Sequence, residues 1–122
     1  MNLTSIIRPA FNSRLHAIEQ YESRAEDIQR DVLAHLLQTA ADTEWGHLYK
    51  YNNIRSYEEF AAQVPVNTYE ELKGYIDRMR HGERNVLWPG WVKWYAKSSG
   101  TTNDKSKFIP VSRDGLHDTH YQ

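Results

Sequence analysis

Residues Trp91–Ser112, WVKWYAKSSGTTNDKSKFIPVS, contain the most informative pattern in this chain. Two runs rich in aromatic and β-branched residues flank a short polar segment, which predicts a β-hairpin. We expect its strands at Trp91–Lys97 and Lys107–Val111. Pro110 indicates that the return strand is an edge strand or is close to its end, because proline has no N–H to donate.

The loop between these strands is rich in groups that bind phosphate. They are Ser98, Ser99, Gly100, Thr101 and Thr102, followed by Lys105 and Lys107. Glycine lets a phosphate approach the backbone, hydroxyl and N–H groups donate hydrogen bonds, and lysine neutralises charge. A solvated hairpin turn would not need this composition, since short hairpins favour Asn-Gly or Asp-Gly.

The loop is not the P-loop of nucleoside triphosphatases. That motif, GxxxxGK[ST], places a glycine directly before its lysine. Here Lys105 follows Gly100 one residue too early, and Asp104 stands in the place of the second glycine. Another kind of phosphate-binding module remains open at this point.

Composition limits the classes of function. The chain has 122 residues, a formal charge of −1 and no cysteine. It is therefore one domain or part of one, and it lacks the basic excess typical of nucleic-acid binders. Disulfides and thiolate sites are excluded. No apolar run is long enough to span a bilayer, and Arg8 and Pro9 interrupt any signal peptide, so we expect a soluble, cytoplasmic protein that binds neither nucleic acid nor membrane.

The first third of the chain has helical periodicity. Apolar residues recur three or four positions apart in Leu3–Tyr21 and again in Arg24–Ala41. We expect these segments to form two helices that pack on each other as a helical hairpin. Gly46 is expected to end the second helical segment in a left-handed conformation.

Two capping boxes predict short helices further along. Ser56 with Glu59 opens Tyr57–Gln63, and Thr68 with Glu71 opens Tyr69–Met79. Gly82 closes the second of these helices. The Trp88-Pro89-Gly90 turn then leads into the hairpin, and Ser112 caps a last helix.

These elements define an α+β fragment. Residues 1–84 are expected to be mostly helical, with a helical hairpin and two short helices. Residues 85–122 are expected to form strand, loop, strand and the start of a helix. The chain stops as if it were cut inside that helix.

Histidine spacing does not make a metal site. Glu44 and His47 are three residues apart, and so are His117 and His120. Zinc sites need three or four protein ligands, and neither pair has the further partners. Asp114 beside those histidines does not define a nucleophile and base either. We therefore expect no catalytic residue and no metal ligand in this chain.

Several motifs resemble one known family. The form SSGTT followed by Lys107 is similar to the ATP-phosphate motif of the firefly luciferase-like adenylate-forming superfamily. The continuation KSKFIPV is closer to the auxin-responsive acyl-acid amido synthetase family, also called the Gretchen-Hagen-three family. Three further segments resemble its N-terminal third in the same order, namely residues 41–46 (ADTEWG), 64–72 (VPVNTYEEL) and 85–90 (NVLWPG).

This resemblance implies a ligase whose full-length form is an α/β enzyme. Such an enzyme activates a carboxylic acid with ATP and Mg²⁺ as an acyl-adenylate, and an amino acid then receives the acyl group. The cofactor-binding residues carried over are Ser98, Ser99, Gly100, Thr101, Thr102 and Lys107. The sequence departs from the family at Asn103-Asp104, where a glycine often follows the motif.

The same resemblance implies that the chain, 1–122, is the N-terminal portion of an adenylate-forming amido synthetase domain, and that most of the active site lies outside it. We expect the fragment alone to be inactive and to self-associate through exposed strand edges. The alternative is a non-catalytic helical interaction domain in which residues 1–80 bind a partner and the phosphate loop is vestigial.

Overall fold

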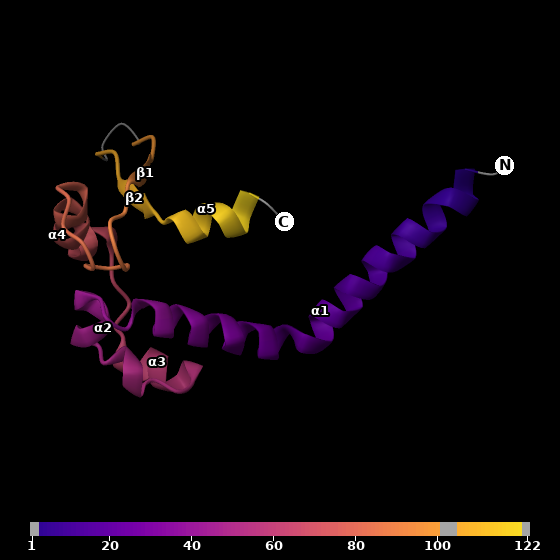
Figure 1. Ribbon diagram of the computed structural model, residues 1–122, viewed down its shortest axis with the longest axis horizontal. Coiled ribbons are helices and arrows are strands. Elements are labelled where there is room, and N and C mark those ends of the chain that lie inside the picture. The colour runs from indigo at the N-terminus through magenta and orange to yellow at the C-terminus, as the bar shows by residue number, and fades with distance from the viewer. Residues whose placement is uncertain (1–2, 101–104, 121–122) are drawn as a thin grey trace.

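The computed structural model describes residues 3–100 and 105–120. Helices dominate the described chain, and an antiparallel β-hairpin follows α4, so the α+β class is confirmed (Figure 1). The elements are α1 (Leu3–Ala40), α2 (Glu44–Leu48), the 3₁₀ turn η1 (Tyr51–Asn53), α3 (Tyr57–Gln63), α4 (Tyr69–Arg80), β1 (Trp94–Lys97), β2 (Phe108–Val111) and α5 (Arg113–His120).

The predicted helical hairpin is wrong. Helix α1 runs without a break from Leu3 to Ala40, so its two halves extend away from each other and do not pack together (Figure 1). Glu22, Ser23 and Arg24 lie at the expected turn, and none of these residue types stops a helix. Pro9 lies inside α1, beyond its first turn, and the helix continues through it.

The capping box predicted at Thr68 is confirmed, and the one predicted at Ser56 is confirmed in part. Thr68 and Glu71 form a full capping box at the start of α4, and Gly82, with φ 98°, follows its end. At the start of α3, the Ser56 hydroxyl accepts a hydrogen bond from the Glu59 N–H, as predicted. The Glu59 carboxylate accepts from the preceding Arg55 N–H, so the reciprocal bond of a capping box is displaced by one residue.

Gly46 has a different role from the predicted one. It lies inside α2 and is buried, and its φ is not positive. A Cβ at this position would lie 2.1 Å from the Ala40 carbonyl oxygen and 2.7 Å from that of Ala41. Glycine is therefore needed because the end of α1 passes directly against the backbone of α2.

The core lies between α4 and the segment that precedes β1. Met79, Val86 and Val92 form its buried cluster, with Tyr75 and Tyr95 packed against it. A second buried contact joins α2 to α4, because the ring of Trp45 meets the ring of Tyr75 edge-on at 5.3 Å. These contacts fix the base of the hairpin to the helical part.

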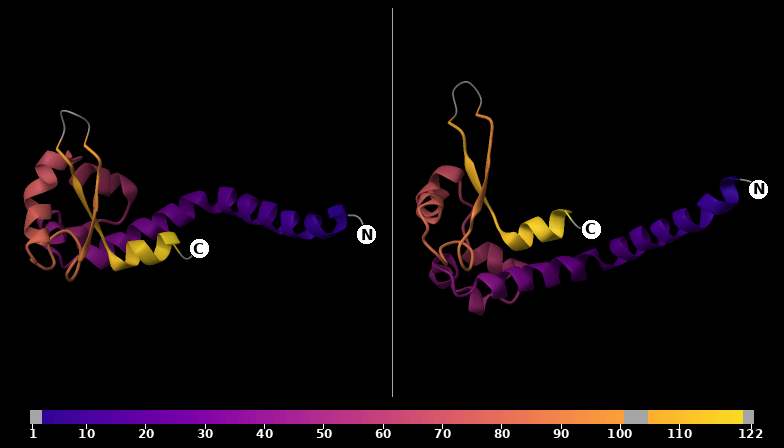
Figure 2. Two further views of the ribbon diagram at one scale, coloured as in Figure 1. Left: turned by 90° about the horizontal axis from the view of Figure 1, so that it is seen from above. Right: turned by 45° about the horizontal axis from the view of Figure 1, so that its top comes forward.

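The hairpin is shorter than predicted but in the expected place. β1 begins at Trp94, because Val92 is already buried in the core before pairing starts. Trp94 pairs with Val111 and Lys97 with Phe108. The two strands of the hairpin rise from the helical part and away from α1 (Figure 2). Ser112 caps α5 as predicted, since its hydroxyl accepts from the Gly115 N–H.

None of the helices in the described chain combines the length and the apolar character needed to cross a membrane.

Candidate functional site

The hairpin tip brings two of the predicted phosphate ligands together. Beyond the last strand pair, the Ser98 N–H donates to the Lys107 carbonyl at 2.9 Å. The Lys107 N–H in turn donates to the Ser98 hydroxyl oxygen, also at 2.9 Å. These two hydrogen bonds join residues that are nine positions apart in the sequence, and we call the pair the Ser98–Lys107 rung. The rung holds the two ends of the loop together.

The described residues of the loop lie at the surface of the molecule. Ser98, Ser99, Gly100, Lys105 and Lys107 are all exposed. The Ser98 hydroxyl oxygen accepts from Lys107, which leaves its O–H proton to donate. The predicted ligands Thr101 and Thr102 lie outside the described residues, as do Asn103 and Asp104.

Helix α4 holds the return strand of the hairpin. The Phe108 N–H donates to the Tyr69 hydroxyl at 2.9 Å. The Lys107 ammonium lies 5.8 Å from the centre of the Tyr69 ring, within range of a cation–π contact. At the other end of α4, the Arg80 guanidinium stacks 3.6 Å from the centre of the Phe108 ring. Tyr69 thus positions Lys107, a role that its sequence position just after the Thr68 cap did not reveal.

Residues 41–46 and 85–90 are joined by backbone hydrogen bonds. The Glu44 N–H donates to the Asn85 carbonyl at 2.8 Å, and the Trp45 N–H donates to the Val86 carbonyl at 3.1 Å. The first turn of α2 has no intrahelical acceptors for these N–H groups, so the second segment satisfies them. Thr43, which is buried, caps the same turn by accepting from the Gly46 N–H.

Residues 85–90 form a closed loop. Asn85 adopts a left-handed backbone with φ 56°, and its side-chain oxygen accepts from the Gly90 N–H at 2.7 Å. The Asn85 N–H donates to the Gly90 carbonyl at 3.1 Å. Gly90 also has a positive φ, 74°. The two hydrogen bonds between Asn85 and Gly90 therefore fix the direction in which the chain leaves this loop toward β1.

An arginine joins α2, α4 and the loop after α4. Arg78 lies 2.8 Å from a Glu44 carboxylate oxygen and 2.7 Å from one of Glu83. The hydrogen bond from Arg78 lowers the pKa of Glu83 below its ordinary value. The two carboxylates, Glu83 first, raise the pKa of Arg78. Arg78 therefore remains charged and bridges segments that come from three parts of the sequence.

The Tyr95 hydroxyl is buried beneath the hairpin and has no hydrogen-bond partner among the described residues. Burial raises the pKa of Tyr95, and the charge of Arg80 opposes that rise.

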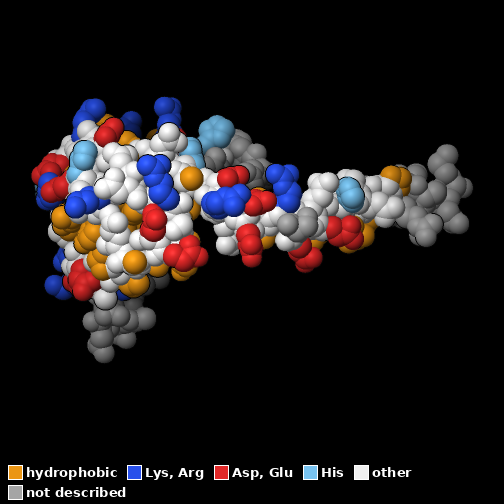
Figure 3. Space-filling model, turned by 90° about the horizontal axis from the view of Figure 1, so that it is seen from below, with side chains coloured by type: hydrophobic (Ala, Val, Ile, Leu, Met, Phe, Trp, Pro, Cys, Tyr) orange, Lys and Arg blue, Asp and Glu red, His pale blue; other side chains and the backbone are white. Residues whose placement is uncertain are grey.

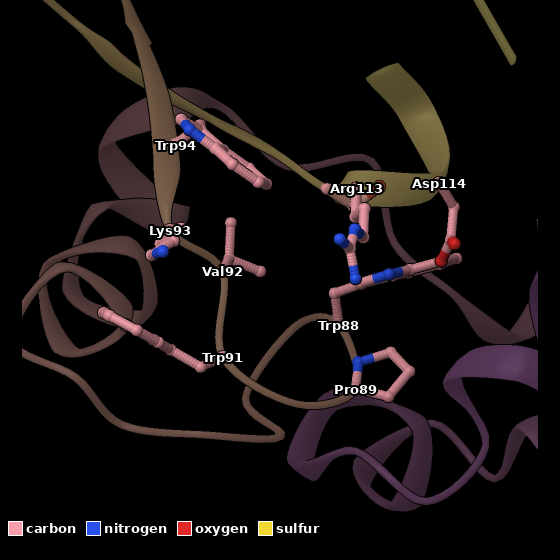
Figure 4. A pocket seen from close by; sticks show the side chains of 9 residues that line it. Trp88, Pro89, Trp91, Val92, Lys93, Trp94, Arg113 and Asp114 are labelled. Atoms are coloured by element: carbon pink, nitrogen blue, oxygen red, sulfur yellow. The ribbon is translucent and has the colours of Figure 1, made fainter. Parts of the chain in front are cut away.

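A cavity of about 300 Å³ lies beside the base of the hairpin. Trp88 and Pro89 come from the closed loop, Trp94 from β1, and Arg113 and Asp114 from α5. Figure 4 shows the Trp88 ring directed toward Arg113 and Asp114. The cavity is apart from the Ser98–Lys107 rung, since neither of these residues lines it.

The described part of the chain contains no group of three or more His, Asp or Glu side chains suited to a metal ion. The Glu44 carboxylate is paired with the Arg78 guanidinium at 2.8 Å.

Comparison with known proteins decides the family. Residues 14–122 match the GH3 family N-terminal domain. The chain belongs to the GH3 family. The acyl-acid amido synthetase resemblance of the sequence motifs is thereby confirmed, because relatives in this family carry that activity in their names.

Three relatives show the extent of the similarity. Indole-3-acetic acid-amido synthetase GH3.5 of Arabidopsis thaliana is 31% identical over 104 residues, which cover 84% of this chain and 17% of that protein. Jasmonoyl–L-amino acid synthetase JAR6 of Nicotiana attenuata is 30% identical over 106 residues, covering 84% and 18%. The putative indole-3-acetic acid-amido synthetase GH3.10 of Oryza sativa subsp. japonica is 34% identical over 106 residues, covering 84% and 22%. The chain thus spans about a fifth of the length of these relatives.

The three GH3 segments of this chain have distinct structural tasks. Residues 41–46 and 85–90 bind each other and fix the base of the hairpin. Residues 64–72 contain the start of α4 and Tyr69, which binds the return strand. All three segments therefore help to hold one element in place, the hairpin that carries Ser98 and Lys107.

Proposed function

We propose that this chain is the ATP-phosphate-binding, N-terminal part of an acyl-acid amido synthetase. The main support for this proposal is the Ser98–Lys107 rung. It places a hydroxyl donor and a cation at the open end of a hairpin that α4 holds in place. Family membership supports the same assignment.

The donor set suits a triphosphate. Ser98 and Ser99 offer hydroxyl protons, Gly100 leaves room for close approach of a phosphate to the backbone, and Lys107 supplies positive charge. Thr101 and Thr102 would add two further hydroxyl donors. When bound, ATP with Mg²⁺ supplies the adenylyl group that activates a carboxylic acid, with pyrophosphate as leaving group, before an amino acid takes the acyl group.

The contribution of this chain to that chemistry is electrostatic. Negative charge develops on the phosphate oxygens during adenylyl transfer, and donors fixed in advance stabilise it. The hairpin is suited to this task because α4 fixes Lys107 through Tyr69 and fixes Phe108 through Arg80. Lys107 therefore does not have to be ordered at the moment of reaction.

Calorimetry with ATP and Mg²⁺ tests the proposal. Lys107→Ala should weaken ATP binding by at least about tenfold, since a charge-assisted contact to phosphate is lost. Lys73→Ala is the matched control, because Lys73 is exposed on α4 and is not part of the hairpin; its affinity should equal that of the wild type.

Equal ATP affinity in the wild type and Lys107→Ala would contradict the proposed role of the hairpin. Absence of ATP binding in the wild type would favour the alternative, a non-catalytic helical interaction domain with a vestigial loop.

A further inference from the structure

The hairpin and its flanks carry a local excess of positive charge. Residues 91–113 contain four lysines and one arginine against a single acidic residue, Asp104, although the whole chain has a formal charge of −1. On the face of the molecule drawn in Figure 3, by contrast, Lys and Arg side chains lie among Asp and Glu side chains. The proposed phosphate contact uses only one cation of this segment, Lys107.

Lys97 and Arg80 converge on one aromatic ring. In the register of the hairpin, Lys97 lies directly opposite Phe108. The Lys97 ammonium is 5.9 Å from the centre of the Phe108 ring, and the Arg80 guanidinium is 3.6 Å from the same centre. The two cations are at most 9.5 Å apart, because these two distances add up to that value. This separation is within about one Debye length at 0.1 M salt, so the two cations repel each other and favour an anion beside them.

Carboxylates neutralise little of this charge. Among the described residues, Lys97, Lys105 and Lys107 form no ion pair. Arg80 pairs with Asp77 at 3.6 Å, and both side chains are partly exposed. Ion pairs at the surface contribute little, because water screens them. The cations around the Phe108 ring therefore keep most of their charge for a bound anion.

The ring with its two cations is adjacent to the Ser98–Lys107 rung. Lys97 directly precedes Ser98, and Phe108 directly follows Lys107, so the ring lies one residue from the rung on both strands. The Lys107 ammonium lies near the first residue of α4, and Arg80 is the last residue of the same helix. These cations are therefore on the side of the hairpin where α4 lies (Figure 2).

We infer that Lys97 and Arg80 form a second phosphate-binding pair beside the rung. The inference rests on the proposed function and assigns to this pair the part of the ATP phosphate chain that Lys107 does not contact. A terminal phosphate group carries about −1.5 to −2 charges at pH 7, so a triphosphate needs more than one cation. Lys97 supplies the direct contact, and the Phe108 ring holds its ammonium in place beforehand. Arg80 contributes charge from its stacked position on the same ring.

Calorimetry of the 122-residue chain with ATP and Mg²⁺ tests the inference. Lys97→Gln should weaken ATP binding about fivefold, because a charge-assisted contact to phosphate is lost. Pyrophosphate, which has neither base nor sugar, should show the same loss. Lys97→Arg should restore most of the affinity, since arginine keeps the charge and stacks on aromatic rings.

Lys93→Gln is the matched control. Lys93 is also an exposed lysine, and its ammonium lies 5.6 Å from the ring of Trp91 and 5.9 Å from that of Trp94. Its removal changes the net charge by the same amount, four residues further from the rung. At about 0.15 M salt, charges more than about 8 Å from the ligand are screened, so the ATP affinity of Lys93→Gln should equal that of the wild type.

Asp77→Asn should change the affinity in the opposite direction. It removes the carboxylate that pairs with Arg80, so ATP should bind about twofold more tightly. Asp27→Asn is its control, because Asp27 pairs with Arg30 at the same spacing on α1, and it should leave ATP affinity unchanged. Unchanged or weaker ATP binding in Asp77→Asn would exclude Arg80 from the site and overturn the inference.

The lysine variants separate this inference from the proposed function. If Lys107→Ala weakens ATP binding and Lys97→Gln does not, the second pair is overturned and the proposed function stands. Equal losses in Lys97→Gln and Lys93→Gln would assign the effect to net charge and would also overturn the pair. A wild-type chain that does not bind ATP would overturn both. Circular dichroism of the variants should match that of the wild type, because Lys93 and Lys97 are exposed.

Discussion

Gly46 is the residue whose identity the fold restricts most directly. An added Cβ would meet two backbone carbonyl oxygens, which cannot move aside as a flexible side chain can. We expect Gly46→Ala to lower the free energy of unfolding by about 3 kcal/mol, the upper part of the usual range for overpacking. Urea unfolding followed by tryptophan fluorescence measures this change.

Substitution of Gly74 by alanine should change the free energy of unfolding in the opposite direction in the same experiment. It lies within α4, and a Cβ there would have no atom within 4 Å. Gly74→Ala should raise the free energy of unfolding by about 0.5–1 kcal/mol, because alanine favours the helix over glycine. If Gly46→Ala also raises the free energy of unfolding, the close contact of α2 with the end of α1 is not present in solution.

Arg78 makes stability depend on pH through Glu83. Because the folded state lowers the pKa of Glu83, this carboxylate stabilises the fold above its unfolded pKa and loses that effect as pH falls through the folded value. This loss of stability is therefore expected in the acidic range, below the ordinary glutamate pKa of 4.5. The urea midpoint of Arg78→Met should fall less on acidification than that of the wild type.

The control for this pH series is Arg55→Met. Arg55 is exposed and forms no ion pair with the described residues, so its removal should leave the pH dependence unchanged. Identical pH profiles for the wild type and Arg78→Met would contradict the bridge from Arg78 to Glu83.

At the scale of elements, Tyr69 determines how firmly the hairpin is attached to α4. Tyr69→Phe removes the oxygen that accepts from the Phe108 N–H, at a cost of about 1 kcal/mol. Amide hydrogen exchange at Phe108 should become faster in this variant. Tyr57→Phe is the control, because Tyr57 is 69% exposed and should leave the Phe108 exchange rate unchanged. Equal exchange in all three proteins would mean that α4 does not brace β2.

Elements that depend on local chemistry were predictable from the sequence. Thr68 with Glu71, and Ser112, each act within three residues of themselves, so a short sequence window contains the whole signal. The unbroken α1 was not predicted, although Glu22 and Ser23 carry no stop signal. Periodicity shows that a face is apolar, but it does not show whether a neighbour covers that face.

At the scale of the whole molecule, the contacts that the sequence did not predict join distant segments. The bonds from α2 to Asn85 and Val86 join residues about 40 positions apart, and the bond from Phe108 to Tyr69 spans 39. The composition of the loop predicted Ser98 and Lys107 as phosphate ligands, and the structure brings these two together. The support of this pair by α4 could not be predicted from the sequence, because it depends on the three-dimensional fold.

A nuclear magnetic resonance titration of the 122-residue chain with ATP and Mg²⁺ tests the central claim most directly, because it observes each backbone amide separately. We predict that the largest shifts occur at Ser98, Ser99, Gly100 and Lys107. Pyrophosphate should reproduce them and adenosine should not, since the phosphates make the contacts. Absence of shifts at these amides, or larger shifts around Trp88 and Arg113, would contradict a phosphate-binding role for the hairpin.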